Sequence, residues 1–279
     1  MAPELTNTRA ERVAAVRALS GRSPSSASAR RRTGTYLVEG PQAVREAVRF
    51  APEHVSELFV SEQAAARYAE IVLDALKAGL HARTTSEEVA RAMSPDSQGV
   101  IAVLDAVPLR LADVLASATP RLVAVLSRVR DPGNAGTVIR AADAAGADLV
   151  VVTAESVDVH SPKVVRSSAG SLFHLPVVTG VELADAAQLL RDAGLTILAA
   201  DGHADSDLDE LLDTAGPGDG PDLATPTAWL FGNEAWGLPD DDLALADAAV
   251  RVPIRGRAES LNLATAAAVC LFASARAQR

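Results

Sequence analysis

Apolar runs and amphipathic stretches alternate along the chain, and their order predicts two successive α/β regions. In the first region, strand-like runs lie at residues 35–40, 54–60, 80–84 and 98–105. The helical patterns between and before them cover residues 9–19, 41–50, 61–79 and 86–93. Residues 20–34 are rich in serine and arginine and lack a helical pattern, so we expect a flexible segment there.

The second region repeats the alternation after a connector at residues 106–119, and a helix from about Ser260 to Ala277 ends the chain. Its strand-like runs lie at residues 121–129, 147–154, 172–178, 195–201, 227–231 and 249–254. Strands separated by helices form parallel sheets with helices on both faces. The pattern therefore predicts two α/β domains, residues 1–105 and 120–279. In the second, ligands would bind beyond the carboxyl ends of the parallel strands.

Composition and charge narrow the class of protein. No apolar run of the 279 residues reaches the roughly 18 that a membrane span needs, and the charged N-terminus does not resemble a signal peptide. A single cysteine, Cys270, leaves no internal disulfide, so we expect a reduced, cytosolic setting. The net charge of −10 argues against indiscriminate coating of nucleic acid, but the first 49 residues hold nine arginines against four glutamates. Five scattered histidines lack the spacing of metal ligands, so we expect no metal.

Three turns at predicted strand ends carry the candidate chemistry. In "DPGNAGTVIR", Asn134 is placed to cap a helix and Arg140 follows six residues later. In "LFGNEAWGLP", Glu234 stands just past a buried strand, and in "RGRAESLNLA", Ser260 is placed to cap the last helix with Asn262 in its first turn. Each turn alone also fits a structural role, as a capped helix or a glycine turn.

A fourth segment, "SPKVVRSSAG", puts Lys163 and Arg166 on one helical face. Two interpretations stay open for these cations, contact with a phosphate or plain solvation. We expect His174, in an apolar run, to be a hydrogen-bonded core histidine, and Cys270 to be an ordinary core residue.

Taken together and in this order, the three turns resemble the signature motifs of the SpoU/TrmH family of RNA ribose 2′-O-methyltransferases. The matching stretches are "DPGNAGTVIRAADAAGA", "LFGNEAWGLP" and "VPIRGRAESLNLATAAAVCLF". "KVVRSSAGSLFHLPV" resembles the family's stretch between the first two motifs, and "YLVEGPQAVREAV" is similar to its small N-terminal α/β substrate-binding domain. The resemblance covers the chain from about Tyr36 to the C-terminus.

The resemblance implies a fold, a cofactor and an assembly. In this family, of the SPOUT class, the C-terminal chain of the parallel sheet is threaded into a deep trefoil knot that holds S-adenosylmethionine. Members are typically homodimers with the active site at the dimer interface. By motif position, the residues against the cofactor, largely through their backbone, are Gly232, Val252 and Leu261. The family's functional positions match Asn134, Arg140, Glu234, Ser260 and Asn262.

Methyl transfer to a ribose hydroxyl needs in-line positioning and removal of a proton. The family's arginine is often assigned to activating the hydroxyl, but a guanidinium is a poor base at neutral pH because its pKa lies above about 12. We therefore expect Arg140 to clamp a phosphate beside the target ribose, oriented by Asn134. Whether Arg140 also takes the proton stays open. Glu234 is expected to hold either the substrate or its own loop.

The resemblance points to structured RNA as substrate. Large-subunit ribosomal RNA is favoured because simpler relatives lack the N-terminal domain; a transfer RNA and a non-catalytic RNA-binding role are the alternatives. Side chains expected to contact RNA phosphates are Arg30, Arg31, Arg32, Lys163 and Arg166. The chain departs from the family at Ala235 and Trp236, where a glycine and a small or basic residue are common. We expect Trp236 to pack against the knot rather than to stack on a base.

Overall fold

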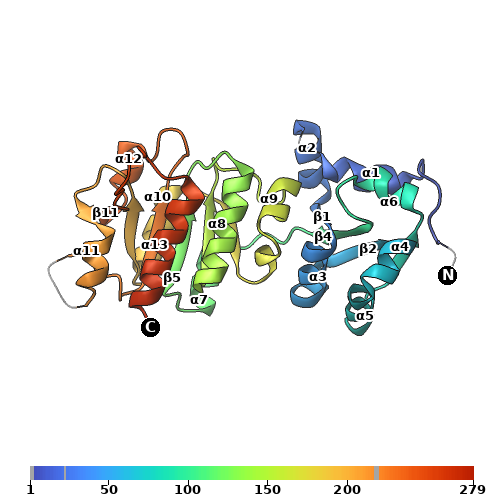
Figure 1. Ribbon diagram of the computed structural model, residues 1–279, viewed down its shortest axis with the longest axis horizontal. Coiled ribbons are helices and arrows are strands. Elements are labelled where there is room, and N and C mark those ends of the chain that lie inside the picture. Colours follow the sequence, from blue (N-terminus) through green and yellow to red (C-terminus); the bar gives the residue numbers. More distant parts are fainter. Residues whose placement is uncertain (1–2, 22, 217–219) are drawn as a thin grey trace. The chain divides into compact units, whose positions relative to one another are not determined.

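The computed structural model describes residues 3–21, 23–216 and 220–279, which divide into two compact units (Figure 1). Unit 1 comprises Met1–Val107 and His160–His174, and unit 2 comprises Pro108–Val159 and Leu175–Arg279. The sequence placed residues 160–174 within the C-terminal domain, whereas in the structure this segment packs with the N-terminal one. Residues 217–219, within the glycine- and proline-rich run at residues 216–226, lie outside the described part of the chain.

Unit 1 is built on a four-stranded sheet in the order β1-β4-β2-β3. The strands are β1 (Thr35–Glu39), β2 (Val55–Ser61), β3 (Ala82–Thr85) and β4 (Val100–Asp105). Strand β4 runs antiparallel to both β1 and β2, whereas β2 and β3 are parallel. Successive side chains of a strand point to opposite faces of its sheet. Accordingly, Tyr36 and Val38 belong to one apolar core of the unit and Leu37 to the other.

Helices cover both faces of this sheet (Figure 1). Core residues on the Tyr36 face come from α3 (Pro41–Phe50), α4 (Glu62–Arg67), α5 (Ala69–Lys77) and α9 (Pro162–Ser167). The opposite face is covered by α1 (Glu11–Ser20), α2 (Pro24–Thr33) and α6 (Glu87–Met93). Short 3-10 turns η1 (Pro52–His54) and η2 (Ser171–Phe173) complete the unit. Leu172 and Phe173 of the inserted segment pack on the same core as α3.

Helix α2 corrects the sequence analysis, which expected a flexible segment at residues 20–34. Ser23 caps this helix by accepting a hydrogen bond from the Ser26 amide, and Gly34 ends it with a φ of 65°. Buried Ala29 ties the helix to the core, which the polar composition of the segment did not indicate. The helix predicted over residues 61–79 is in fact two, α4 and α5, which meet at Tyr68.

Unit 2 contains a parallel sheet in the order β7-β6-β5-β10-β8-β11-β9, as the alternating pattern predicted. Its strands are β5 (Leu122–Leu126), β6 (Leu149–Thr153), β7 (Val177–Val181), β8 (Thr196–Ala200), β9 (Ser206–Asp207), β10 (Thr227–Phe231) and β11 (Ala248–Arg251). Every residue of β5, β6 and β10 is buried. Continuous apolar strands of this kind are typical of parallel sheets covered on both faces.

Helices α7 (Leu111–Ser117) and α10 (Leu183–Asp192) pack on one face of this sheet. Helices α8 (Pro132–Ala145) and α13 (Leu263–Ala277) lie side by side against the strands on the other face (Figure 1). The unit also contains α11 (Leu208–Asp213), which contacts α13, and α12 (Asp240–Leu243). Under α13, buried Trp229 donates a 2.8 Å hydrogen bond from Nε1 to Ser274 Oγ and stacks on Phe231. This packing fixes the end of β10 from which the second motif begins.

Several predicted elements of unit 2 change in the structure. The connector at residues 106–119 contains α7, and the strand predicted at residues 172–178 is η2 followed by β7, because the segment leaves the sheet to pack on unit 1. The last helix begins at Leu263 with Asn262 as its N-cap, so Ser260 is not the cap. Likewise Asp131, not Asn134, caps α8. No helix in the described ranges is both long and apolar enough to cross a membrane.

Candidate functional site

The three turns singled out by the sequence meet at the carboxyl edge of the parallel sheet in unit 2. Helix α8 follows β5, the "LFGNEAWGLP" turn follows β10, and the chain from β11 reaches α13 through residues 252–262. Strands β5 and β10 are neighbours, and β8 separates β10 from β11. Because all carboxyl ends of a parallel sheet lie at one edge, loops far apart in sequence are brought together there.

Glu234 links the second turn to the first. Its Oε1 accepts hydrogen bonds from the Asp131 amide at 3.0 Å and from Asn134 Nδ2 at 3.2 Å, and its Oε2 accepts one from the Arg130 amide at 3.2 Å. A carboxylate beside the first amides of a helix also interacts favourably with the helix dipole. With three donors already bound, Glu234 holds the start of α8 in place, so of its two expected roles the structure favours holding a loop.

Asn134 and Asn262 connect the first turn to the third. Asn262 Nδ2 donates to Asn134 Oδ1 at 3.0 Å, while Asn262 Oδ1 accepts from the Ala264 amide at 2.9 Å and so caps α13. Asn134 therefore accepts from one motif and donates to another, because an amide side chain has both functions. The three residues form a continuous hydrogen-bonded chain Glu234–Asn134–Asn262, which we call the motif cluster.

Two residues that were not predicted from the sequence, Asn233 and Asp242, hold the backbone and side chains next to this cluster. Asn233 Nδ2 donates to the Arg128 carbonyl at 2.8 Å, and its Oδ1 accepts from the Ala235 amide at 2.8 Å. Buried Asp242 accepts hydrogen bonds from Ser127 Oγ at 2.9 Å and from Arg128 Nε and Nη2 at 3.2 and 3.3 Å. Asn233 could have been selected from the sequence because it is adjacent to Glu234. Asp242 could not, because nothing in the sequence separates it from its neighbours Asp240 and Asp241.

Gly232 lets the second turn close on itself. Asn233 and Gly237 exchange backbone hydrogen bonds of 2.9 and 3.0 Å, which folds residues 233–237 into a tight loop. A Cβ atom at Gly232 would lie 2.5 Å from the Gly237 carbonyl carbon and oxygen, far inside contact distance. A glycine is therefore required here by a close approach of backbone to backbone.

Arg140 and Ser260 are not hydrogen-bonded into the motif cluster within a single chain. Arg140 follows Asn134 by six residues, which puts it about 9 Å along the helix and about 120° around its axis. Both Arg140 and Ser260 are exposed, and neither side chain forms a hydrogen bond or ion pair within the described residues. The structure thus joins three of the five predicted catalytic positions and leaves two facing solvent.

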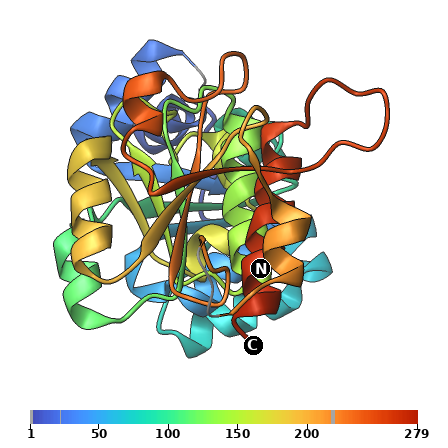
Figure 2. The same ribbon diagram turned by 90° about the vertical axis from the view of Figure 1, so that its left-hand side faces the viewer.

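The residues expected to contact the cofactor border the same edge. Gly232 is buried in the second turn, Val252 directly follows β11, and Leu261 is 36% exposed in the third turn. Figure 2 shows the chain between β11 and α13 as a loop that extends away from the sheet. Within the described part of the chain, the backbone of residues 254–261 makes no hydrogen bond, so its polar groups are available to a ligand.

The arginines of α2 divide into two kinds. Arg31 and Arg32 are exposed, as a role in binding phosphates requires. Arg30 is only 6% exposed and donates from Nη1 to the carbonyls of Leu19 and Gly21 at 3.0 and 3.2 Å. The prediction that Arg30 contacts RNA is corrected, because its guanidinium ties α2 to the end of α1.

Arg166 also has a structural role. Its guanidinium pairs with the buried carboxylate of Glu39 at the end of β1, which in turn accepts a hydrogen bond from Ser94 Oγ. A second carboxylate, that of Asp96, lies 3.4 Å from the same guanidinium nitrogen. Because a buried carboxylate needs a paired charge, Arg166 neutralises Glu39, and its contact with RNA stays a prediction. Lys163, three residues earlier on α9, is partly exposed.

Three further side chains were interpreted from sequence. Trp236 is 61% exposed, so the expected packing of its ring does not occur within the chain. His174 is not in a strand core; it ends η2, with Nε2 3.2 Å from Glu46 Oε2 and its ring edge-on to Phe50. Cys270 is fully buried, as expected, and burial raises the pKa of its thiol to about 12.

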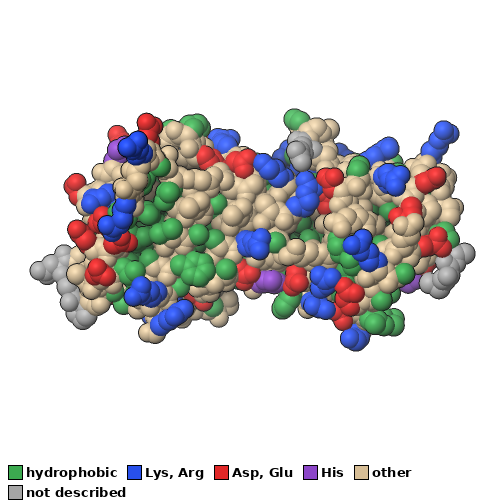
Figure 3. All heavy atoms as spheres, viewed as in Figure 1, with side chains coloured by type: hydrophobic (Ala, Val, Ile, Leu, Met, Phe, Trp, Pro, Cys, Tyr) green, Lys and Arg blue, Asp and Glu red, His purple; other side chains and the backbone are tan. Residues whose placement is uncertain are grey.

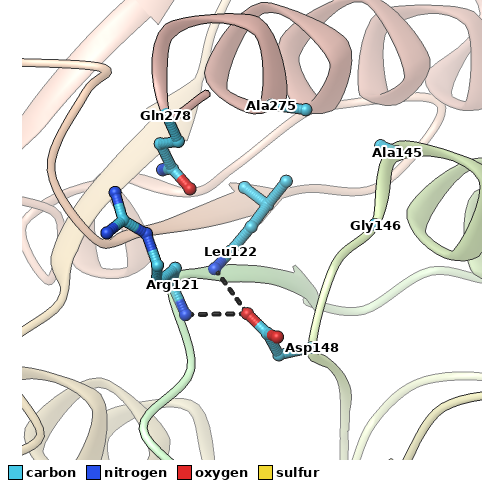
Figure 4. Close-up of a pocket in the computed structure, with 7 residues that line it drawn as sticks. All are labelled: Arg121, Leu122, Ala145, Gly146, Asp148, Ala275 and Gln278. Atoms are coloured by element: carbon cyan, nitrogen blue, oxygen red, sulfur yellow. Dashed lines mark hydrogen bonds between the residues drawn. The ribbon is translucent and has the colours of Figure 1, made fainter.

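A pocket of about 210 Å³ lies at the opposite, amino edge of the same sheet. Figure 4 shows its lining, where Asp148 accepts hydrogen bonds from the amides of Arg121 and Leu122 at 2.7 and 3.1 Å. The α8 and α13 helices contribute their C-terminal ends, including Gly146 and Gln278. Ligands of parallel sheets bind at the other edge, so we do not assign this pocket to the cofactor. No group of three potential metal ligands occurs among the described residues.

The fold and the motif cluster define an α/β enzyme domain with a three-loop site at its carboxyl edge, joined to a smaller α/β module. The chain belongs to the SpoU rRNA methylase family, whose model matches residues 121–272. A second model, for RNA 2′-O ribose methyltransferase substrate binding, matches residues 37–109. Together the two models span both α/β regions that the sequence pattern predicted.

Relatives and solved structures agree with this family. The chain is 33% identical over 245 residues to the 23S rRNA (guanosine(2553)-2′-O)-methyltransferase RlmP of Bacillus subtilis, covering 87% of this chain and 89% of the relative. It is 31% identical over 263 residues to the 23S rRNA (uridine(2479)-2′-O)-methyltransferase of Streptomyces viridochromogenes, covering 88% and 84%. An AdoMet-bound rRNA methyltransferase from Sinorhizobium meliloti superposes with a TM-score of 0.79 at 28% identity, covering 98% of this chain and 97% of that one.

Proposed function

We propose that this protein is an S-adenosylmethionine-dependent RNA methyltransferase that modifies a ribose 2′-hydroxyl in large-subunit ribosomal RNA. The observation that carries the proposal is the motif cluster, in which Glu234, Asn134 and Asn262 from three separate loops are hydrogen-bonded together. Relatives that share most of the chain's length act on 23S rRNA, which supports the ribosomal substrate over a transfer RNA. An enzyme with this substrate would work in the cytoplasm.

The residues of the carboxyl edge fit the cofactor. Unpaired backbone groups of residues 254–261 and the partly exposed side chains of Ile254 and Leu261 could bind an adenosine moiety by hydrogen bonds and apolar contact. Gly232 and Val252 border the same space by their positions after β10 and β11. Bound S-adenosylmethionine supplies an electrophilic methyl group and leaves a neutral thioether behind.

The protein's part in the reaction is to position the ribose and to handle its proton. The 2′-oxygen would form a bond to the methyl carbon as the carbon–sulfur bond breaks, and its proton would pass to solvent. Negative charge on that oxygen must therefore be stabilised as the bond forms. Arg140 is assigned to a phosphate beside the target ribose. A bidentate guanidinium–phosphate contact there would hold the ribose in position and stabilise the negative charge that develops on the 2′-oxygen. Glu234, Asn134 and Asn262 act as positioning residues that hold the three loops in register.

We also infer a homodimer. Arg140 lies on the exposed side of α8, and the neighbouring α13 exposes Val269 and Phe272, at 40% and 49%. Figure 3 shows hydrophobic side chains gathered on the face of unit 2 that carries these two helices. A second copy on this face would cover the apolar side chains and bring Arg140 close to a site, which accounts for its separation from the motif cluster in one chain.

A trefoil knot in the C-terminal chain is part of the same proposal. The path that supports it leaves β11, beyond β8 in the sheet, and returns through residues 252–262 to α13, which packs over β10 and β5. On the way, Asn262 reaches Asn134, which is itself held by Glu234 of the second turn. Knots are rare among protein folds, so a knot needs a functional reason to persist. A ligand site built from the knotted loops would be such a reason.

Unit 1 is assigned to binding the RNA. Its exposed Arg31 and Arg32, with Lys163, supply cations for phosphates. Replacing Arg31 and Arg32 together by alanine should weaken RNA binding and reduce the magnitude of its logarithmic salt slope by about two. An unchanged slope would remove these residues from the interface.

Arg140 provides the sharpest test of the mechanism. Arg140→Ala should lower kcat about 100-fold or more, since the hydroxyl loses its electrostatic partner. Arg140→Lys keeps the charge but not the bidentate geometry, and we expect it to remain well below wild type. If the lysine variant retained near wild-type turnover, the bidentate clamp would be wrong.

The function itself is tested by mapping ribose methylation in ribosomal RNA from cells with and without the gene. Loss of a single site confirms the substrate, and loss of none counts against it. Calorimetric titration with S-adenosylmethionine separates the enzyme from a non-catalytic RNA-binding protein of the same fold, for which no binding is expected.

A further inference from the structure

The two tryptophans of the chain have opposite environments. Trp229 is fully buried and hydrogen-bonded to Ser274, whereas Trp236 is 61% exposed although it is the largest apolar side chain available. Trp236 belongs to the second turn, two residues after Glu234. No packing requirement within the chain therefore explains a tryptophan at this position.

The turn that carries Trp236 is held by hydrogen bonds and does not depend on its ring. Asn233 and Gly237 close the turn through their backbones, and Asn233 Oδ1 accepts from the Ala235 amide at 2.8 Å. On the other side, Asn233 Nδ2 and the Glu234 carboxylate fasten the turn to the backbone of residues 128–131. An aromatic ring displayed on a fixed backbone loses little entropy when it binds a ligand.

An arginine lies beside the same turn through its backbone. The Arg130 amide is 3.2 Å from Glu234 Oε2, so the backbone of Arg130 flanks the turn that carries Trp236. The Arg130 side chain is exposed and forms no ion pair or hydrogen bond within the described residues. Proteins that bind unpaired nucleic acid combine these two features, a ring for stacking on a base and a cation for the backbone.

We propose that Trp236 stacks on an unpaired base of the RNA next to the modified nucleotide, and that Arg130 binds a phosphate of the same strand. This inference rests on the proposed function and adds a preference for a single-stranded target. A base inside a duplex is already stacked on both faces, so the ring selects nucleotides in loops or bulges.

The natural fluorescence of the protein tests the idea directly, because buried Trp229 acts as a constant background. The full-length protein is titrated with an RNA stem-loop that has an unpaired loop, and separately with a fully paired duplex of equal length. We expect the stem-loop to quench emission far more than the duplex does, and Trp236→Phe to abolish most of the change. Equal quenching by both RNAs would overturn the preference for unpaired bases.

Two other outcomes would assign the ring elsewhere and overturn the proposal. Quenching by S-adenosylmethionine alone would place Trp236 on the adenine of the cofactor. A change in emission with protein concentration alone, without RNA, would place it against a second copy of the chain. Binding supplies a further check: Trp236→Ala should raise the Kd for the stem-loop about tenfold, and Trp236→Phe, which keeps a ring, should restore most of the affinity.

Measuring methyl transfer to RNA distinguishes failure of the stacking proposal from failure of the proposed function on which it rests. If the wild-type protein methylates ribosomal RNA and Trp236→Ala does so with unchanged KM, the stacking role is wrong while the function stands. If the wild-type protein transfers no methyl group but the stem-loop still quenches Trp236, the proposed function is wrong while the stacking role stands. Arg130→Ala should reduce the salt slope of stem-loop binding by about one, and an unchanged slope would exclude its phosphate contact.

Discussion

The two edges of the parallel sheet in unit 2 each hold a carboxylate that accepts two successive backbone amides, yet only one edge is suited to chemistry. At the amino edge, Asp148 binds the amides of Arg121 and Leu122, where β5 begins. At the carboxyl edge, Glu234 binds the amides of Arg130 and Asp131, where the chain leaves β5 for α8. The local geometry is similar, so the carboxylate alone does not define a site.

The difference lies in what surrounds each carboxylate. At the amino edge, the side chains of Arg121 and Gln278 donate hydrogen bonds to the carbonyls of Ala224 and Thr225. Polar side chains there satisfy backbone carbonyls of the loop before β10. At the carboxyl edge, Glu234 continues into Asn134 and Asn262, which belong to two other loops, and Arg130 and Trp236 on the first two of these loops remain exposed. Two features thus distinguish the functional edge. Its side chains connect several loops by hydrogen bonds, and other side chains there have no hydrogen-bond partner among the described residues.

The largest contrast is expected from removing the two carboxylates. Glu234→Ala should lower kcat about 100-fold, since a small displacement of the loops misplaces the reacting groups. Asp148→Ala, the matched control, should leave kcat unchanged, and each variant should lose about 1 kcal/mol of stability from its broken hydrogen bonds. Methyl-transfer kinetics and thermal unfolding of both proteins make the comparison. An equal loss of activity in Asp148→Ala would mean that the edges do not differ in function.

Substitutions at Gly232 and Gly146, one at each edge of the sheet, test the same difference between the edges through the backbone. Gly232→Ala puts a methyl group 2.5 Å from the Gly237 backbone, and this clash should cost about 1–3 kcal/mol and lower activity at least tenfold. Gly146→Ala, at the amino edge, meets no atom within 4 Å but must adopt a φ of +76°. We expect it to cost about 1 kcal/mol without lowering activity. Full activity in Gly232→Ala would show that the closure of the second turn is not needed.

Asn262 allows capping to be separated from the contact with Asn134. Asn262→Ser keeps an oxygen that caps α13 and should stay within a few tenths of a kcal/mol of wild-type stability, whereas Asn262→Ala should lose about 1 kcal/mol. Both lose the hydrogen bond to Asn134, so both should lose about tenfold in kcat, the effect of one hydrogen bond. Recovery of activity in the serine variant would mean that Asn262 acts only as a cap.

The smallest effect is expected at Cys270, in the middle of α13 (Leu263–Ala277), whose caps Asn262 and Gln278 lie at the two edges. Its thiol is fully buried and its pKa is raised to about 12 from an ordinary value of 9.0. The thiolate is the reactive form, so thiol reagents should label the native protein only after it unfolds. Above about pH 9 the unfolded chain binds fewer protons than the folded one, so the free energy of unfolding should decrease there. Rapid labelling of native protein would contradict this.

Part of the fold and of the site could be predicted from local patterns. Alternating apolar runs and amphipathic helices indicated the parallel sheet, because strand and helix periods are visible in a single sequence. Motif spacing selected Asn134, Glu234 and Asn262. The same patterns missed α2, because Ala29 and Arg30 are buried by contacts that the composition of a serine- and arginine-rich segment does not reveal.

By itself, the sequence determined the order of the elements, the family and the residue types of the site. Only the tertiary structure decided which of those side chains meet. It joined Asn134 to Glu234 and to Asn262 across 100 and 128 positions of chain, paired Arg166 with the buried Glu39, and left Trp236 exposed. The reason is physical: periodicity and turn chemistry act over a few residues, whereas burial and hydrogen-bond partners depend on which distant segments the sheet brings to one edge.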